Sequence, residues 1–248
     1  MLTIERMNGE FYDLESMGLR ISDFSISSPE YVYETAQVDG LSGLLVLETT
    51  VLPRILKCLI KVQGDSIAEL IKKRDLIFRI FRSKEPFYLT DKNAESLRWK
   101  VKCDGAFDLQ RVSRFGTTEV HLVAFSPYSE TVTKVSRKFN TASFVFNNLG
   151  TEEINMRSQT ETEIIFRGTS NNLAITNLST GEVWKYNGST LAKDEIKLIG
   201  VRSFKNKQSI FRNTNKELIS FIPGNNEFEI SGADEGFEIL ISSRFYFT

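Results

Sequence analysis

The amino-acid sequence predicts a mainly β protein of two domains, with a single amphipathic helix in the first. Short runs rich in Val, Ile, Phe, Thr and Tyr alternate with Gly, Asn, Ser and Pro along most of the chain, as in proteins built from short strands and turns. One segment departs from this pattern with a helical period. A length of 248 residues is sufficient for two separate hydrophobic cores.

Strands are expected in both halves of the sequence. In the first half the β-rich runs are residues 44–52, 87–90, 97–103 and 118–125. In the second half they are residues 143–147, 161–167, 173–177, 182–186, 195–201, 227–231 and 237–247. The longest apolar run, residues 41–47, is far shorter than the roughly 18 residues that span a bilayer, so no membrane partner is expected.

Residues 66–81 are predicted to form the helix. Ser66 and Glu69 have the spacing of a capping box, in which each side chain bonds a backbone N–H at the helix start. A stripe with a 3.6-residue period is expected to lie inward across a sheet, and it consists of Ile67, Leu70, Ile71, Ile77, Phe78 and Phe81.

A domain boundary is expected within residues 127–139, where a β-rich run gives way to a polar stretch. We therefore predict domains at residues 1–132 and 133–248. The first domain is polarised in charge, because its first 50 residues hold nine acids and two bases whereas residues 51–126 hold nine acids and 15 bases. Such halves can attract each other within one chain or between neighbouring chains in a ring.

Composition argues against several classes of function. The 31 basic and 32 acidic residues leave a net charge of −1, whereas proteins that grip nucleic acid usually carry a basic excess. The single histidine and the two cysteines, Cys58 and Cys103, lack metal-site spacing. No phosphate-binding or dinucleotide fingerprint occurs. We therefore predict that the protein is not an enzyme and that it has no catalytic, cofactor-binding or metal-binding residue. The two cysteines and the absence of a secretory signal predict that the protein is made in a reducing compartment.

Two weaker candidates come from single side chains. His121 is the one histidine available as a general base, but a histidine on an alternating strand is more often structural. Trp184 and Tyr186 are two apart on a predicted strand and share one face, where sugar rings can stack on aromatic surfaces. Packing between the sheets of a sandwich is the favoured interpretation of this pair.

A pattern spread along the whole chain resembles the distal tail protein (Dit) family of long, non-contractile-tailed bacteriophages and their prophage relatives. In the first domain the glycine-bearing stretch is residues 38–43, with Asp39, Gly40 and Gly43, and a strand run and one amphipathic helix follow it. The domain closes with an aromatic-x-Pro-Tyr motif that contains Pro127 and Tyr128. The family usually has Asp before this proline, and here the residue is Ser126.

The second domain continues the resemblance through three turn motifs. Residues 148–150 are similar to the opening of the family's C-terminal sandwich. Residues 176–181 resemble its asparagine-rich hairpin, with Asn177 and Gly181. Residues 222–226 resemble the turn before its last strands, with Pro223, Gly224 and Asn226. Each motif is common turn chemistry, and the order and spacing of all of them carry the resemblance.

The resemblance implies a fold and a role. The N-terminal domain would be a β-sandwich or split barrel with one helix, forming a homohexameric ring around the tail lumen. The C-terminal domain would be a galectin-like or carbohydrate-module-like β-sandwich that projects outward. The ring would sit at the virion tail tip or baseplate, after assembly in the bacterial host cytoplasm.

Partners follow from the same resemblance. The ring would join the tail tube protein to the tail-associated hub protein, with receptor-binding proteins around it in some phages. DNA would pass through the lumen without specific binding. An alternative from another class is a carbohydrate-binding adhesion module that contacts the host cell wall through the C-terminal domain, using Trp184 and Tyr186.

Overall fold

A computed structural model of the protein describes residues 1–40, 42–82 and 84–248. The chain divides into two compact units, unit 1 with Met1–Ser129 and Thr248, and unit 2 with Glu130–Phe247. Each unit is built mainly of antiparallel strands, and α1 (Ile67–Ile80) is the one α-helix among the described residues. This confirms the predicted mainly β class with a single helix. None of the described helical segments has the length and hydropathy needed to cross a membrane.

Unit 1 contains one large open sheet. Its strands are hydrogen-bonded in the order β2-β1-β7-β8-β10-β6-β3, and β9 pairs with the end of β10. A short 3₁₀ helix, η1 (Lys92–Ala94), follows β7. The bounds of these strands are β1 Leu2–Arg6, β2 Phe11–Asp13, β3 Arg20–Ile26, β6 Arg54–Gln63, β7 Phe87–Asp91, β8 Leu97–Cys103, β9 Gln110–Val112 and β10 Phe115–Ala124.

The core of unit 1 follows from strict alternation in the two longest strands. On β6 the inward side chains include Leu56 and Cys58, and on β10 they include Val120 and Leu122. The register places Cys58 opposite Val120 and Leu56 opposite Leu122. Because successive side chains of a strand point to opposite faces, one face of the sheet is apolar and needs a cover. The helix provides part of that cover.

Helix α1 starts as the sequence predicts but buries a narrower face. The Ser66 hydroxyl accepts from the Glu69 N–H at 3.1 Å, and the Glu69 carboxylate accepts from the N–H of Asp65 at 2.7 Å. Of the predicted stripe, Leu70, Ile77 and Phe81 are buried, and Ile80 joins them. The prediction was wrong for Ile67, Ile71 and Phe78, which are exposed. A helix that lies on a sheet buries only a narrow arc of its surface, and these three side chains fall outside it.

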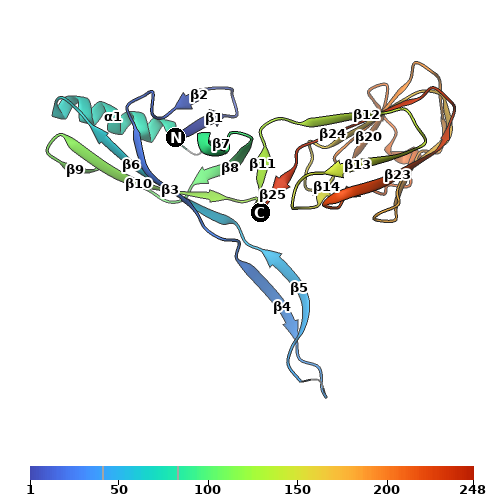
Figure 1. The fold of residues 1–248 in the computed structure, drawn as a ribbon, viewed down its shortest axis with the longest axis horizontal. Helices are drawn as coiled ribbons and strands as arrows, with labels where there is room; N and C mark the ends of the chain where they lie inside the picture. The colour runs from blue at the N-terminus through green and yellow to red at the C-terminus, as the bar shows by residue number, and fades with distance from the viewer. Residues whose placement is uncertain (41, 83) are drawn as a thin grey trace. The chain divides into compact units, whose positions relative to one another are not determined.

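Two further strands of unit 1 form a sheet of their own. Strands β4 (Tyr31–Ala36) and β5 (Leu45–Val51) pair only with each other among the described residues. Figure 1 shows this pair leaving the body of unit 1 between β3 and β6. We call residues 31–40 and 42–51 the arm. Residue 41, part of the glycine-bearing motif, lies outside the described residues.

Unit 2 is built around two sheets. One has the order β12-β24-β15-β19-β20-β21, and the other has the order β13-β23-β16-β17, with β18 beside β16. The bounds are β11 Ser129–Thr131, β12 Val135–Phe139, β13 Ser143–Asn148, β14 Ile154–Asn155, β15 Glu163–Arg167, β16 Ser170–Asn177, β17 Glu182–Lys185, β18 Ser189–Thr190, β19 Glu195–Ile199, β20 Arg202–Lys205, β21 Gln208–Ser209, η2 Phe211–Asn213, β22 Ser220–Phe221, β23 Gly224–Ala233, β24 Glu238–Ser243 and β25 Tyr246–Phe247.

Aromatic side chains join the two sheets of unit 2. Phe139 of β12 stacks on Phe144 of β13 with ring centroids 4.1 Å apart, and Phe144 stacks in turn on Phe228 of β23. Phe166 of β15, in the same sheet as β12, is fully buried. Stacked and edge-on rings fill the space between sheets with little loss of side-chain entropy. The result is a sandwich of two β layers.

Candidate functional site

His121 lies on the outer face of β10 and is partly exposed. Its side chain is 44% accessible, and its Nε2 is 2.7 Å from Oε1 of Glu119, two residues away on the same strand. This is the arrangement of a solvated surface pair. No cluster of three or more His, Cys, Asp or Glu side chains suited to a metal ion occurs in the described part of the chain.

The two cysteines are free thiols in different surroundings. Cys58 is fully buried in the core of unit 1, and Cys103 is partly exposed at the end of β8. Burial raises the pKa of the Cys58 thiol to about 12. Since the thiolate is the reactive form, Cys58 acts as a small apolar side chain.

Trp184 and Tyr186 lie inside unit 2. Trp184 is 1% exposed and Tyr186 is 7% exposed. Trp184 pairs across the sheet with Ile175 of β16, and Tyr186 forms an isolated bridge with Thr214. Neither ring offers an open face on which a sugar could stack, which agrees with the favoured interpretation, packing inside the sandwich, and speaks against the sugar-facing alternative. The two rings pack in the core, because the face that they share is the buried one, whereas Lys185 between them is exposed on the other face.

The asparagine positions of the family-like motifs form a buried polar network in unit 2. The Asn177 side-chain amide donates to the Ser220 carbonyl at 2.8 Å and to Oδ1 of Asn226 at 3.2 Å. The Asn226 side chain bonds both the N–H and the carbonyl of Ile222. Both side chains are 0% exposed, and they hold the turns that contain Gly181, Pro223 and Gly224. These contacts give the motif residues a structural role.

The motif residues of unit 1 fall at two different places. Asp39, Gly40 and Gly43 lie at the tip of the arm, between β4 and β5. Gly40 has φ +83° and Gly43 has φ +94°, values that side chains with a Cβ rarely adopt, so this tip requires glycine. Pro127 and Tyr128 lie in the short link between β10 and β11.

The arm has the most unusual surface in unit 1. Nearly every residue of β4 and β5 is exposed, including large apolar side chains such as Tyr33 and Leu47, each 58% exposed. Adjacent residues of a regular strand point to opposite faces, so Val32 and Tyr33, which are 48% and 58% exposed, place apolar groups on both faces of the arm. A hairpin with two apolar, exposed faces and two open edges is marginally stable alone and marks an interaction surface.

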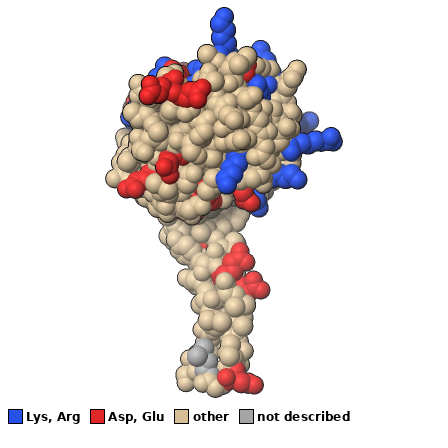
Figure 2. Space-filling model, turned by 90° about the vertical axis from the view of Figure 1, so that its right-hand side faces the viewer, with Lys and Arg blue, Asp and Glu red and all other residues tan. Residues whose placement is uncertain are grey.

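The arm also carries only negative charge. Residues 21–53 contain five acids and no Lys, Arg or His. Figure 2 shows acidic side chains along the narrow arm, without a basic one on the face in view. The register places Glu34 directly opposite Glu48, and like charges at directly opposed positions destabilise a β pair. No hydrogen bond or ion pair engages either carboxylate within the described residues.

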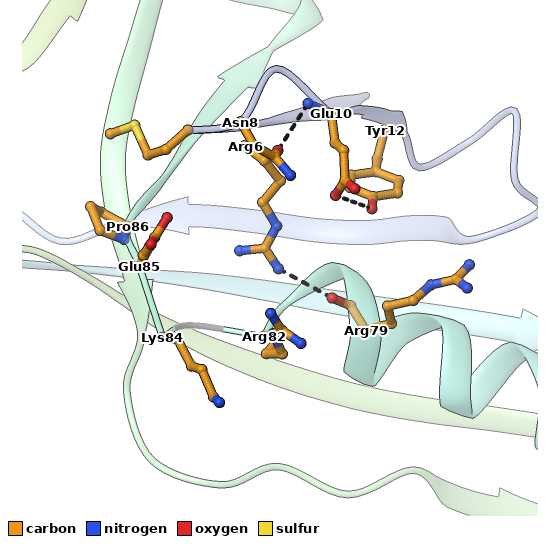
Figure 3. A pocket seen from close by; sticks show the side chains of 10 residues that line it. Arg6, Asn8, Glu10, Tyr12, Arg79, Arg82, Lys84, Glu85 and Pro86 are labelled. Atoms are coloured by element: carbon orange, nitrogen blue, oxygen red, sulfur yellow. Dashed lines mark hydrogen bonds between the residues drawn. The ribbon is translucent and has the colours of Figure 1, made fainter.

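A basic cleft of about 500 Å³ lies elsewhere on unit 1, where the C-terminal end of α1 meets β1, β2 and β7 (Figure 3). The cations around the cleft are Arg6, Arg79, Arg82 and Lys84. Two acids, Glu10 and Glu85, also line it, so the cleft has a net positive charge. In the part of the chain that the structure describes, no hydrogen bond or ion pair engages the side chains of Arg79, Arg82 and Lys84.

Arg6 is fixed at the centre of the basic cleft. Its guanidinium donates to the carbonyls of Arg79 at 3.1 Å and Ile80 at 2.6 Å, which caps the end of α1, and it lies 5.0 Å from the Phe87 ring centroid. Burial lowers the pKa of Arg6 below its usual value, and the positive charge of Arg82 acts in the same direction. The cleft is thus a place where positive charges repel one another.

Neither surface was assigned as a site from the sequence. The sequence predicts a strand and a glycine-bearing loop where the arm lies. Three of the basic residues of the cleft fall within six positions, Arg79, Arg82 and Lys84, but Arg6 lies more than 70 positions away from them. A signal for the arm does exist, because the stretch without bases coincides with two apolar runs on either side of a glycine-rich turn. No local signal points to the cleft, since it depends on β1 lying beside the end of α1.

Comparisons with known proteins agree with this architecture. Residues 12–124 match the phage tail protein RIFT-related domain family. The structure is similar to the crystal structure of the Dit protein of phage SPP1, with a TM-score of 0.77 and 14% sequence identity, and the match covers 99% of each chain. That protein is described as a paradigm of the hub adsorption apparatus in phages that infect Gram-positive bacteria.

Two structures of the phage p2 baseplate in its activated conformation, with Ca and with Sr, are also similar at 9% identity and a TM-score of 0.48. They cover 98% and 97% of this chain, and 97% of their own chains. No curated protein sequence matches the chain. Residues 12–124 of unit 1 thus match a phage tail domain family, and the whole chain has the fold of the SPP1 Dit protein, in agreement with the fold that the resemblance in the sequence implied.

Proposed function

We propose that this protein is a structural component of a phage or prophage tail, a distal tail protein that forms a homohexameric ring at the tail tip. The ring joins the tail tube protein to the tail-associated hub protein. Residues 1–132 form the ring, and residues 133–248 project from it as a β-sandwich. Receptor-binding proteins attach around the ring in some phages, and assembly takes place in the bacterial host cytoplasm.

The observation that carries this proposal is the arm. It exposes apolar side chains on both faces and opposes two carboxylates, so the isolated chain leaves it incompletely stabilised. A protein whose task is to assemble with copies of itself needs such a surface. The phage tail domain in the same unit supports a tail as the assembly in question.

Charge supports a passive conduit. A chain with a net charge of −1 has no basic excess with which to hold a DNA backbone. Each neutralised phosphate would add affinity and slow the exit of DNA through the lumen. We therefore propose that DNA passes through the ring without specific binding.

Size-exclusion chromatography with light scattering, followed by negative-stain imaging, tests the ring. We expect a particle of six 28.3 kDa chains with sixfold symmetry and a central hole, formed by the protein alone or after addition of the hub protein. A protein that remains strictly monomeric at high micromolar concentration, both alone and with the hub protein, would overturn the proposal. A chain in which residues 32–50 are replaced by Asn-Gly is the control, and it should remain monomeric.

A further inference from the structure

We propose that the arm of one copy docks into the basic cleft of the next copy, so that the opposed carboxylates Glu34 and Glu48 are neutralised by Arg79 and Arg82 of its neighbour. This rests on the proposed ring and deepens it, because it names the two surfaces that meet. The occupant of the cleft is thus an acidic, apolar β-hairpin from a second copy of this chain.

The first step is that the arm requires a cover. Its strands pair only with each other among the described residues, and their large apolar side chains are close to half exposed or more. Apolar surface removed from water contributes about 25 cal/mol per Å², so covering the faces of the arm is a strong driving force for association. A partner surface for the arm must also accept its charge.

The second step is that the arm requires a cation. Glu34 and Glu48 are directly opposed, and a β-bulge follows between Glu34 and Thr35. Their mutual repulsion falls when a positive group lies between or beside them. Arginine is suited to this role, because its planar guanidinium donates two parallel hydrogen bonds to a carboxylate.

The third step is that the cleft supplies such cations. Arg79 and Arg82 are exposed at its wall, and neither side chain has a partner within the described residues. The guanidinium of Arg6 is already bonded to carbonyls of α1, so Arg6 adds positive charge to the cleft while it keeps its place there. The volume of about 500 Å³ accommodates several side chains. A negatively charged, extended segment therefore fits the chemistry of the cleft better than an uncharged one.

The fourth step is geometric. The arm and the cleft are different surfaces of the same unit, so pairing one with the other creates a head-to-tail interface, and such interfaces generate rings when the rotation closes. The seven residues of β5 extend about 23 Å at roughly 3.3 Å per residue, so the arm presents a long, narrow element to another copy.

Charge reversal tests the pairing. One variant carries Glu34→Lys and Glu48→Lys, and a second carries Arg79→Glu and Arg82→Glu. We expect each alone to raise the concentration for half-assembly by about a hundredfold, because like charges then meet at the interface. A 1:1 mixture should assemble again, since each reversed surface meets its complement on the other variant. Lys72→Glu with Arg111→Glu makes the same change in net charge away from the cleft and should assemble normally.

The readout is particle mass by light scattering, with ring images, under the conditions in which the unaltered chain assembles. Circular dichroism and thermal unfolding verify that each variant is folded, and the milder pairs Glu34→Gln with Glu48→Gln and Arg79→Gln with Arg82→Gln replace any variant that is not. Each of those neutral pairs should raise the concentration for half-assembly about tenfold. A chain that carries both pairs should raise it by less than the product of the two separate effects, because both remove the same interaction.

Three outcomes would overturn the inference. Reversed variants that assemble like the unaltered chain would reject this pairing while leaving the ring in place. A mixture that fails to assemble, although each variant alone has lost assembly, would show that the two surfaces do not meet each other. An unaltered chain that never assembles, even with the hub protein, would reject both the pairing and the proposed ring.

Discussion

The arm of unit 1 and the four-strand surface of unit 2 formed by β12, β24, β15 and β19 treat charge in opposite ways. Across unit 2, Lys138 pairs with Glu238, Glu238 with Arg167, and Arg167 with Glu195, so positive and negative groups alternate from strand to strand. In the arm, Glu34 faces Glu48 with no compensating group among the described residues. This surface of unit 2 pairs its charges within one chain, whereas the two opposed carboxylates of the arm have no such partner among the described residues.

The same contrast holds for apolar groups. The largest aromatic side chains of unit 2 lie between its sheets, and Trp184 is 1% exposed. Within the described part of the chain, no second layer covers the apolar side chains of the arm. Unit 2 is therefore a self-contained module, whereas the arm is an element that connects to another molecule. Changes at matched positions in the two regions test this comparison.

The largest expected effect is in the core of unit 2. Trp184→Ala removes a fully buried ring and should lower the free energy of unfolding of unit 2 by about 3–5 kcal/mol. Hydrogen exchange at the β16 amides measures this unit separately. Leu191→Ala, at a position 72% exposed, is the matched control and should change it by less than about 0.5 kcal/mol. Equal effects at both positions would contradict the burial of Trp184.

The polar network of unit 2 should show the next largest effect. Asn226→Ala leaves the backbone N–H and carbonyl of Ile222 without their side-chain partner and should cost about 1–3 kcal/mol in denaturant unfolding. Asn225→Ala, one residue away and exposed, is the control. If the two variants unfolded alike, the network would not stabilise the turn.

In the arm, one charge change should have a moderate and stabilising effect. Glu48→Lys places opposite charges across the strands and should stabilise the free arm by about 0.2–1 kcal/mol. Amide exchange in β4 and β5 of the monomer should slow accordingly, by up to about fivefold. Faster exchange would show that the repulsion between the carboxylates does not limit the stability of the arm.

Apolar positions of the arm should matter for assembly and hardly at all for the monomer. Val46→Ser with Leu47→Ser removes exposed groups, so the free energy of unfolding of the monomer should stay within about 0.5 kcal/mol. Self-assembly measured by light scattering should weaken at least about tenfold, because these groups are buried in the proposed interface. Unchanged assembly would mean that the arm remains exposed in the ring.

The smallest effect concerns a single carboxylate in unit 2. The hydrogen bond from Lys138 is the main cause that holds the pKa of Glu238 below its ordinary value of 4.5, and Arg167 adds to it. The stabilisation from this group is therefore present above pH 4.5 and is lost as the pH falls through the lowered pKa. Lys138→Met should move the pKa of Glu238 upward, as carboxyl NMR titration would show, whereas Lys193→Met should not.

The sequence predicted a good part of the fold because local patterns set it. The start of α1 followed from the spacing of Ser66 and Glu69, and alternation located most strands of unit 2 within a few residues. Strands near the N-terminus, such as β1 and β3, had no comparable signal. They are strands because they pair with β7 and β6, which are distant in sequence.

The sequence alone determined the mainly β class, the capped helix, the resemblance to distal tail proteins and the stretch of chain with acids but no bases. Tertiary structure decided which apolar residues were left exposed. Trp184 and Leu47 both lie in β-rich runs, yet one is buried and the other is 58% exposed. The physical reason is that burial requires a second layer at the right distance, and whether a strand has one depends on the path of the whole chain.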